Sequence, residues 1–254
     1  MTGKRMLIDT SKCTACRACM VACKQWHSLP AVDTEFTGVY TNPPDLTGAD
    51  LTNIKFTEAV VGSKLRFLFF NNRCRHCDAP TCKVACPLVP KAIKRQANGI
   101  VRIDPALCRP DDCSAEAIKP CQTACPFKSI SDGVLGIPKK DYVKNGYPVT
   151  TVMRKCDFCY NRMNNSPEAT VLKNPPFVST DGKIKSALPA CKVACPPGAV
   201  KVGAADALLT QANKRVTYLK NHGYPNANLY PAGLLTHVIW VLTEAPSTYG
   251  IVAA

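Results

Sequence analysis

The stretch CTACRACMVAC at residues 13–23 decides the fold, because it places four cysteines at the spacing C-x2-C-x2-C-x3-C. Three more groups of four cysteines follow along the chain, and each of them also ends in C-x3-C. The hexapeptide CKVACP occurs twice, at 82–87 and 191–196. The 16 cysteines therefore form four groups with none left over: Cys13, Cys16, Cys19 and Cys23; Cys74, Cys77, Cys82 and Cys86; Cys108, Cys113, Cys121 and Cys125; and Cys156, Cys159, Cys191 and Cys195.

The spacing within each group is typical of cysteines that bind iron-sulfur clusters. A 4Fe-4S cube takes four thiolates, and three cysteines on a tight loop bind three of its iron atoms. In two-cluster bacterial ferredoxins the fourth cysteine of the run, which a proline follows, binds the neighbouring cluster instead. Pro87, Pro126 and Pro196 follow the last cysteine of three groups, whereas Lys24 follows that of the first. The sequence therefore predicts four 4Fe-4S clusters.

Zinc sites and disulfides are the alternatives for so many cysteines. Zinc sites also use C-x2-C, but zinc ribbons need two separated pairs per site and do not require a C-x3-C-P end. Disulfide frameworks belong to short secreted domains, and no apolar run typical of a signal peptide precedes Cys13. Both alternatives fit the repeated spacing less well than clusters do.

The positive charge of the chain has an explanation inside the protein. Lys and Arg outnumber Asp and Glu by 32 to 18, which gives a net charge of +14. Such a balance is common in nucleic-acid-binding proteins, but cluster-bound thiolates carry negative charge that this sum omits. The basic residues are also scattered between the cysteines, without a basic stretch interleaved with aromatic residues. We therefore expect no nucleic-acid partner.

Short apolar runs between the cysteine groups predict strands. Residues 64–70, 99–104 and 199–202 have the composition and length of strands. Together with a ligand loop and a short helix in each group, they predict a small α+β unit that is repeated in pairs, as in bacterial ferredoxins.

The C-terminal part of the chain contains no cysteine and has a different pattern. Residues 206–220 have apolar residues at helical spacing, and Gly223 follows as a helix cap. Residues 237–242, HVIWVL, predict a strand, which we expect at an interface with a partner. The longest apolar stretch, 229–242, is too short and too polar to span a bilayer, so we expect no membrane span.

The whole chain resembles the four-cluster iron-sulfur (beta) subunits of molybdopterin or tungstopterin oxidoreductases, and most closely those of formate dehydrogenases. The phrases that carry the resemblance are CRACMVACKQWHSLP at 16–30, TGVYTNPPDLTG at 37–48, KLRFLFFNNRCRHC at 64–77, RKCDFCYNRM at 154–163, PACKVACPPGAVKVG at 189–203 and THVIWVLTEAPSTYGI at 236–251. The NPPDL loop and the THVIWVL tail favour formate dehydrogenases within the wider family.

The resemblance implies how the cysteine groups pair. In the family the first group pairs with the fourth and the second with the third, and each pair exchanges its last cysteine. The implied ligand sets are Cys13, Cys16, Cys19 and Cys195; Cys156, Cys159, Cys191 and Cys23; Cys74, Cys77, Cys82 and Cys125; and Cys108, Cys113, Cys121 and Cys86. The third group departs from the family spacing, because residues 109–112 and 114–120 lengthen both of its gaps.

The fold implied by the pairing is α+β, with two ferredoxin-like two-cluster modules, insertions and a C-terminal docking extension. Residues 28–63 form a turn-rich insertion with a predicted strand at 54–56, and residues 160–190 form a second insertion. The expected boundaries are 1–27 plus 150–203 for the module with groups one and four, 64–149 for the module with groups two and three, 28–63 for the insertion, and 204–254 for the helix and tail that dock on a partner.

The function implied by the resemblance is electron transfer. The chain would relay electrons through four 4Fe-4S clusters between a catalytic alpha subunit with a tungsten or molybdenum bis-pterin centre and an external acceptor, such as a cytochrome or a membrane subunit. We expect no catalytic residue in the chain itself. The alternatives are the beta subunit of a sulfur-compound, nitrate or dimethyl sulfoxide reductase, and a free-standing polyferredoxin.

Six basic residues within a few positions of the cysteines are candidates for tuning the cluster potentials, with solvated surface charge as the alternative for each: Lys12, Arg17, Arg73, Arg75, Lys155 and Arg162. His27 and His76 are expected to form hydrogen bonds near a cluster or to be exposed, and His237 to lie in an interface.

Cluster assembly requires free thiols, which favours folding in a reducing compartment. The resemblance then implies export to the periplasm in folded form together with the partner, with the cytoplasm as the alternative.

Overall fold

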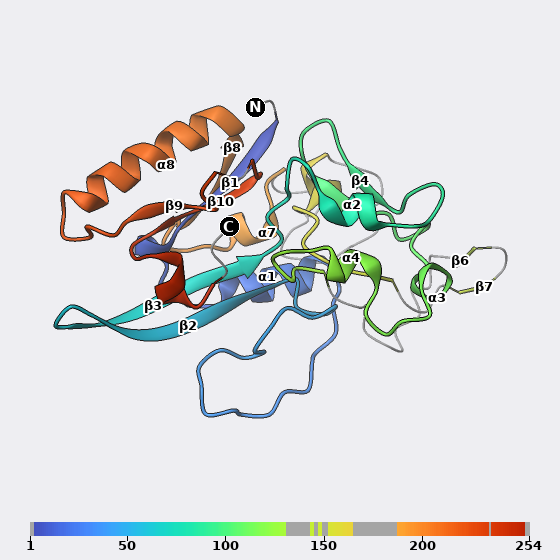
Figure 1. Ribbon diagram of the computed structural model, residues 1–254, viewed down its shortest axis with the longest axis horizontal. Helices are drawn as coiled ribbons and strands as arrows, with labels where there is room; N and C mark the ends of the chain where they lie inside the picture. The colour runs from blue at the N-terminus through green and yellow to red at the C-terminus, as the bar shows by residue number, and fades with distance from the viewer. Residues whose placement is uncertain are drawn as a thin grey trace, which may run out of the picture.

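The computed structural model describes residues 3–130, 143–144, 147–148, 152–164, 187–233 and 235–251. A four-stranded sheet carries one long helix, a long β-hairpin crosses beneath this sheet, and short helices and loops make up the remaining part of the molecule (Figure 1). The mixture of helices and separate small sheets is that of an α+β protein, as the sequence predicts.

The four-stranded sheet joins the two ends of the chain. It contains β1 (Lys4–Asp9), β8 (Val200–Ala204), β9 (Asn228–Tyr230) and β10 (Val238–Leu242), in the order β8-β1-β10-β9. β1 runs parallel to β10, with Ile8 opposite Trp240, while the other two pairs are antiparallel. α8 (Ala205–Lys220) covers one face of the sheet, where Leu208, Ala212 and Leu219 are buried. The strand predicted at 199–202 and the helix predicted at 206–220 are therefore confirmed.

The C-terminal strand β10 is part of this core, which corrects the prediction that residues 237–242 lie in an interface with a partner. All five residues of β10 are buried, and Trp240 is 0% exposed. β10 pairs with β1 and β9 on its two edges, so it is an inner strand of the sheet. An unbroken apolar run fits a strand that is buried on both faces as well as a strand in an interface, and the sequence alone did not distinguish the two.

The helix end follows the predicted capping pattern. Gly223 has a φ of +89°, and the backbone N–H of Tyr224 donates to the carbonyl oxygen of Leu219 at 3.1 Å. This is the bond that closes a Schellman motif, in which glycine takes the left-handed conformation at low cost. Gly223 is therefore a helix cap, as predicted.

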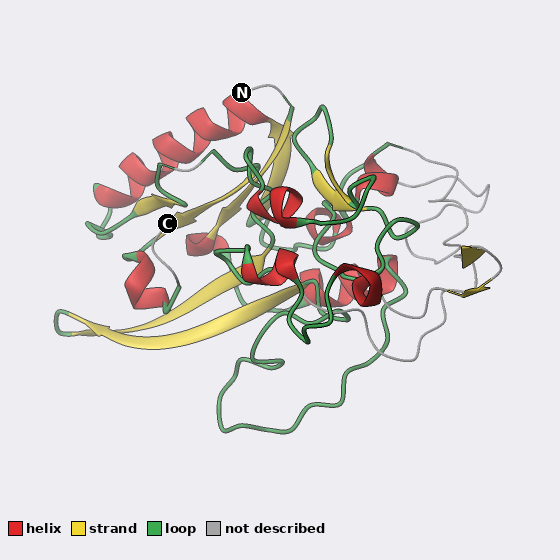
Figure 2. Ribbon diagram, turned by 45° about the vertical axis from the view of Figure 1, so that its right-hand side comes forward, coloured by secondary structure: helices red, strands yellow, loops and turns green. Residues whose placement is uncertain are grey.

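The β-hairpin is longer than the sequence predicts. β2 (Thr52–Val61) and β3 (Lys64–Arg73) pair over ten residues each, where we predicted 54–56 and 64–70. One face of the hairpin packs on the sheet, because the ring of Phe70 stacks on Trp240 at 5.2 Å between centroids. The curved hairpin extends away from the rest of the molecule at its turn (Figure 2).

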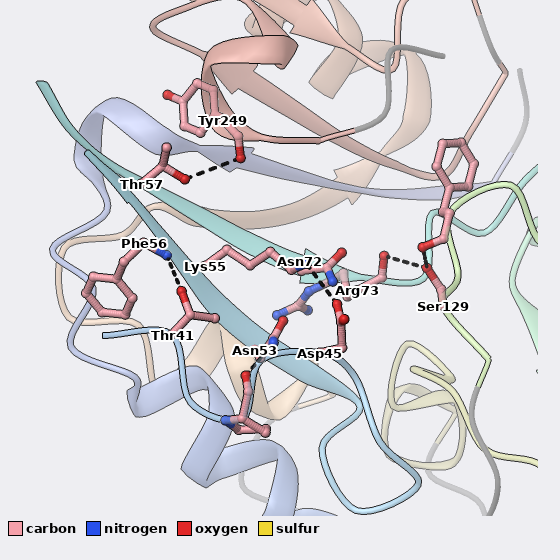
Figure 3. A network of polar contacts seen from close by, with 12 residues as sticks. Thr41, Asp45, Asn53, Lys55, Phe56, Thr57, Asn72, Arg73, Ser129 and Tyr249 are labelled. Atoms are coloured by element: carbon pink, nitrogen blue, oxygen red, sulfur yellow. Dashed lines mark hydrogen bonds and ion pairs between the residues drawn. The ribbon is translucent and has the colours of Figure 1, made fainter. Parts of the chain in front are cut away.

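The insertion at 28–63 is tied to the hairpin by polar contacts and ends as strand β2. The Phe56 backbone N–H donates to Thr41 Oγ1 at 2.9 Å, and Asn53 Nδ2 donates to the carbonyl oxygen of Pro43 at 3.1 Å (Figure 3). Of the second predicted insertion, 160–190, residues 165–186 lie outside the described residues.

The remaining described elements are short, and five of the helices contain cysteines. The helices are η1 (Thr10–Lys12), α1 (Ala18–Trp26), α2 (Thr81–Ala85), α3 (Pro110–Cys113), α4 (Pro120–Thr123), α5 (Tyr160–Met163), α7 (Ala190–Val193) and η2 (Pro246–Tyr249). The remaining strands are β4 (Ile93–Arg95), β5 (Val101–Ile103), β6 (Val143–Lys144) and β7 (Tyr147–Pro148). β5 confirms the strand predicted at 99–104. Among the described residues, every helix is too short or too polar to cross a membrane.

Candidate iron-sulfur sites

The first cavity lies where the loop before α1 meets the segment after α7. It is lined by four cysteines from distant parts of the chain: Cys13, Cys16, Cys19 and Cys195. The loop winds tightly around the cavity, because Ala15 and Arg17 adopt positive φ angles of 54° and 60°. Ile8, Ile54 and Asn71 complete the lining from the two sheets.

The second cavity lies between the end of β3 and the segment after α4. It is lined by Cys74, Cys77, Cys82 and Cys125. Lys155 and Phe127 also line it. Three cysteines of one group and the last cysteine of another therefore surround each of the two cavities.

A third set of four thiols is buried where α1 packs against α7. Its members, none more than 7% exposed, are Cys23, Cys156, Cys159 and Cys191. Burial raises the pKa of Cys23 well above its ordinary value, and the adjacent Cys156 and Cys191 raise it further. Burial likewise raises the pKa of Cys159, and the neighbouring Asp157, Cys191 and Cys23 raise this pKa further. The four sulfurs are thus close electrostatic neighbours.

The fourth set lies around the short helices α3 and α4. Its members are Cys86, Cys108, Cys113 and Cys121. Burial raises the pKa of Cys121 to about 12, and the neighbouring Cys108, Cys113 and Cys86 contribute to this shift. The gap at 109–112 folds mostly as α3, and the gap at 114–120 ends at the first residue of α4.

The chemistry of these donor sets fits iron-sulfur clusters. All sixteen cysteines are free, and eight of them line the two cavities in sets of four. Burial raises the pKa of Cys19 and of Cys156 to about 12, so neither thiol ionises at neutral pH by itself. Cationic iron stabilises thiolates, which removes the cost of burying several of them together. A bound 4Fe-4S cluster supplies reversible one-electron chemistry.

Several N–H groups donate to the cysteine sulfurs and are positioned to stabilise bound thiolates. Asn71 Nδ2 donates to Cys19 Sγ at 3.1 Å. The backbone N–H groups of His76, Ser129 and Met153 donate to Cys74, Cys125 and Cys108 at 3.3–3.4 Å. Asn71 was not among the predicted site residues, and its only signal in the sequence is its position three residues before Cys74.

Comparison with known proteins agrees with the cysteine pattern. The 4Fe-4S dicluster domain family matches residues 65–176, and the 4Fe-4S binding domain family matches residues 4–25. The beta chain of a formate dehydrogenase from Megalodesulfovibrio gigas is 32% identical over 249 residues, which is 97% of each chain. The formate dehydrogenase-O iron-sulfur subunit of Escherichia coli is 34% identical over 247 residues, or 96% of this chain and 68% of the relative. This chain belongs to the family of formate dehydrogenase iron-sulfur (beta) subunits.

A more distant relative is a sulfite dehydrogenase subunit from Allochromatium vinosum. It is 27% identical over 205 residues, which cover 78% of this chain and 68% of the relative. As an iron-sulfur subunit of this family, the chain is an electron-transfer protein with ferredoxin-type 4Fe-4S domains.

Arg73 is a buried cation that contacts the thiols of this iron-sulfur subunit. It is 1% exposed, and its Nη1 donates to Cys191 Sγ at 3.1 Å. Burial by itself lowers the pKa of Arg73, but the neighbouring Cys191, Cys156 and Cys19 raise it above its ordinary value. Of the six predicted tuning residues, Arg73 has the most direct contact with a cysteine sulfur.

Lys155 is a second buried cation, and it lies between two thiol sets. Its Nζ donates to the carbonyl oxygen of Cys156 at 3.0 Å and also to that of Val101. Burial lowers the pKa of Lys155, and Cys74, Cys82 and Cys156 raise it above its ordinary value.

The other candidate tuning residues differ in their surroundings. The Arg75 guanidinium lies 4.7 Å from the ring centroid of Phe127 and lines the second cavity. Arg162 is buried, and its guanidinium lies 4.9 Å from the ring centroid of Trp26. Arg17 lines the first cavity. Lys12 is exposed, which fits the alternative of a solvated surface charge.

The histidines hold loops in place beside the thiols. His76 Nδ1 accepts from the backbone N–H of Val101 at 3.1 Å, and burial holds the pKa of His76 well below its usual range. His27 pairs with Asp157 at 3.2 Å, beside Cys159. The prediction that His237 lies in an interface is wrong. His237 is 0% exposed within the fold, and its Nδ1 forms a hydrogen bond of 2.7 Å with the carbonyl oxygen of Lys4.

Proposed function

We propose that this chain is the electron-transfer subunit of a formate dehydrogenase. In this proposal it relays electrons through four 4Fe-4S clusters between a catalytic alpha subunit with a tungsten or molybdenum bis-pterin centre and an external acceptor. The observation that carries the proposal is that each of two cavities is lined by three cysteines of one group and the last cysteine of another, while all sixteen cysteines are free. The similarity to the beta chain from Megalodesulfovibrio gigas over 97% of both chains supports formate as the partner's substrate.

The proposed ligands of the four clusters are the four sets, which we number in spatial order. Cluster 1 takes Cys13, Cys16, Cys19 and Cys195; cluster 2 takes Cys23, Cys156, Cys159 and Cys191; cluster 3 takes Cys74, Cys77, Cys82 and Cys125; cluster 4 takes Cys86, Cys108, Cys113 and Cys121.

Electrostatic contacts between the sets support a single row in this order. Cys191 of cluster 2 raises the pKa of Cys19 of cluster 1, after the larger effect of burial. In the same way, Cys74 of cluster 3 raises the pKa of Cys156 of cluster 2. Cys82 of cluster 3 likewise raises the pKa of Cys121 of cluster 4. An electron would therefore pass through four neighbouring clusters.

The residues of this chain position and tune the clusters and do not change bonds of a substrate. Buried apolar residues such as Ile8 and Ile54 keep water from the first cavity. N–H groups and buried cations stabilise negative charge at the sulfurs, which raises the potential at which a cluster accepts an electron. The substrate chemistry is that of the partner.

The two-module arrangement is part of the proposal, with one change from the sequence prediction. The strands β1 and β8 adjoin clusters 1 and 2, and the strands β4 and β5 adjoin clusters 3 and 4. The modules keep the boundaries 1–27 plus 150–203 and 64–149. The tail from residue 204 belongs to the first module, since β9 and β10 complete its sheet.

The surface that we propose for the catalytic subunit is the aromatic face of the β2–β3 hairpin. At its inner end, Ile54 and Asn71 pair across the strands and line the first cavity. Further out on the same face, the rings of Phe56, Phe67 and Phe69 lie at centroid distances of 4.9 to 5.8 Å. Phe67 is 45% exposed. The aromatic face thus leads from solvent directly to cluster 1.

The composition of this face favours the catalytic subunit over a diffusing acceptor. Permanent subunit interfaces are more hydrophobic, whereas transient redox partners bind through small contacts. Cys16 of the adjoining set is exposed, so a catalytic partner that covers the aromatic face brings its own redox centre close to cluster 1. The acceptor, a cytochrome or a membrane subunit, then binds near cluster 4.

Folded export to the periplasm together with the catalytic subunit completes the proposal, with the cytoplasm as the alternative. The clusters need free thiols for assembly, and a chain with assembled clusters must cross the membrane already folded. Immunoblots of periplasmic and cytoplasmic fractions of the native organism distinguish the two compartments.

The experiment that tests the proposal is formate reduction of the clusters in the native complex, purified without oxygen. Formate should bleach the visible absorbance of the clusters and produce electron paramagnetic resonance (EPR) signals of reduced 4Fe-4S clusters. Reduction by sulfite and not by formate would instead support the kind of partner suggested by the sulfite dehydrogenase relative. A chain that purifies alone with all its iron would indicate a free polyferredoxin.

A further inference from the structure

Two side chains of β3 connect the thiols of the first and second sets. Asn71 Nδ2 donates to Cys19 Sγ at 3.1 Å. Arg73 Nε donates to Asn71 Oδ1 at 2.7 Å, and Arg73 Nη1 donates to Cys191 Sγ at 3.1 Å. Residues 71 and 73 are two apart on a strand, so both side chains leave the same face of the hairpin. An unbroken series of hydrogen bonds thus runs from one ligand set to the next.

The connection is held in one geometry by its surroundings. Thr52 lies opposite Arg73 in the hairpin, and its hydroxyl donates to Asn71 Oδ1 at 3.1 Å while it accepts from Arg73 Nη2 at 3.0 Å. Thr52, Asn71 and Arg73 are all buried, at no more than 3% exposure. Buried and fully bonded polar side chains have few alternative rotamers, so the two donors point at fixed sulfurs.

Arg73 is a buried cation whose neighbours include several cysteine sulfurs. Within the described part of the chain, Arg73 contacts no carboxylate, and the neighbouring groups that raise its pKa are Cys191, Cys156 and Cys19. A buried cation without a counter-charge is strongly unfavourable. Cluster-bound thiolates on both sides of the guanidinium provide that counter-charge.

We propose that Asn71 and Arg73 form a bridge that sets the reduction potentials of clusters 1 and 2 together. The inference rests on the proposed function, because it requires that both thiol sets hold clusters. A reduced cluster carries one more negative charge, so a cation and N–H donors at its sulfurs favour reduction. Arg73 acts on cluster 2 directly, and it acts on cluster 1 through its charge and through Asn71. Both are positioning residues.

The test is a redox titration of the complete complex, followed by EPR, for Arg73→Met and Asn71→Leu. Arg73→Met should make reduction of both clusters about tenfold less favourable, which is about 59 mV for one electron. Asn71→Leu should affect cluster 1 more than cluster 2, because only cluster 1 loses a direct donor. Arg73→Lys keeps the charge, so the reduction potentials of both clusters should stay close to those of the wild type. Signals changed by Cys195→Ser and Cys159→Ser identify clusters 1 and 2.

Arg66→Met is the matched control, since Arg66 lies on the same strand and pairs with Glu244 instead of a thiol. It should leave both potentials unchanged. If Arg73→Met loses iron, Arg73→Gln, which keeps an N–H donor without the charge, replaces it in the titration. Unchanged potentials in an Arg73 variant with full iron content would overturn the bridge and leave the proposed function intact. A complex without iron-sulfur signals would instead overturn the proposed function.

Discussion

The indole Nε1 of Trp240 donates to the backbone carbonyl oxygen of Asn71 at 3.0 Å. The strand near the end of the chain therefore holds the strand from which Asn71 reaches Cys19. The same indole stacks on Phe70, the residue before Asn71. The C-terminal tail thus contributes to the fold around the first cavity through packing and a buried hydrogen bond.

Removing the Trp240 ring should destabilise the whole subunit. Trp240→Ala leaves a cavity beside Phe70 and an unpaired carbonyl at Asn71, and such substitutions cost about 3–5 kcal/mol. Urea unfolding of the metal-loaded protein measures the loss. Tyr218→Ala on the outer surface of α8 removes an exposed ring and should change stability by no more than about 0.5 kcal/mol. Equal effects of the two substitutions would show that β10 is not a core strand.

Serine substitutions of single cysteines test the exchange of ligands between groups. Cys13→Ser and Cys195→Ser should alter the same cluster signal, because both thiols line the first cavity although 182 positions separate them. Cys23→Ser should alter a different signal, although Cys23 belongs to the same sequence group as Cys13. EPR or Mössbauer spectra of the reduced complexes give the comparison. If Cys13→Ser and Cys23→Ser, made separately, both removed the same signal, the exchange of ligands between groups would be contradicted.

Removing the charge of Lys155 should lower the potential of the clusters around it. Lys155 is buried beside Cys74, Cys82 and Cys156, so Lys155→Met removes a cation that favours the reduced state. We expect a shift on the order of 60 mV, the one-electron equivalent of a tenfold change in an equilibrium constant. Lys94→Met is the control, because Lys94 is partly exposed and pairs with Asp104. A redox titration in which both variants match the wild type would contradict a tuning role.

A polar substitution on the aromatic face should weaken binding of the catalytic subunit. Phe67→Ser removes a ring that is 45% exposed and packed on Phe56 and Phe69. Tyr218→Ser removes a ring of similar exposure, 49%, from α8. Co-purification with the tagged catalytic subunit should fall for the first variant only, while the iron content of the chain stays unchanged. Retention of the complex by Phe67→Ser, with reduced transfer to the acceptor, would assign the face to the acceptor instead.

The sequence predicted those features that depend on local spacing. The cysteine groups, the short strands β5 and β8 and the helix α8 all follow from patterns within a few residues of one another. The pairing of β1 with β10 joins segments more than 200 residues apart, and no local pattern specifies it. For that reason the buried strand β10 was wrongly expected in an interface.

The polar contacts of the sites were also beyond local patterns. The role of Asn71 depends on its side-chain hydrogen bond with Thr52 of the neighbouring strand and on the position of Cys19, which comes from a distant helix. Arg73 stood out in the sequence only because it precedes Cys74. Its contact with Cys191, 118 positions away, follows from the folded structure alone.

The most direct test of the account is the metal content of the native complex, purified without oxygen and measured together with its Mössbauer spectrum. Four 4Fe-4S clusters for the 16 cysteines predict sixteen iron atoms per chain, beyond those of the catalytic subunit, and no zinc. The spectrum should show 4Fe-4S clusters only. Zinc in place of iron, or iron that fills fewer than four clusters, would contradict a chain of four clusters in this protein.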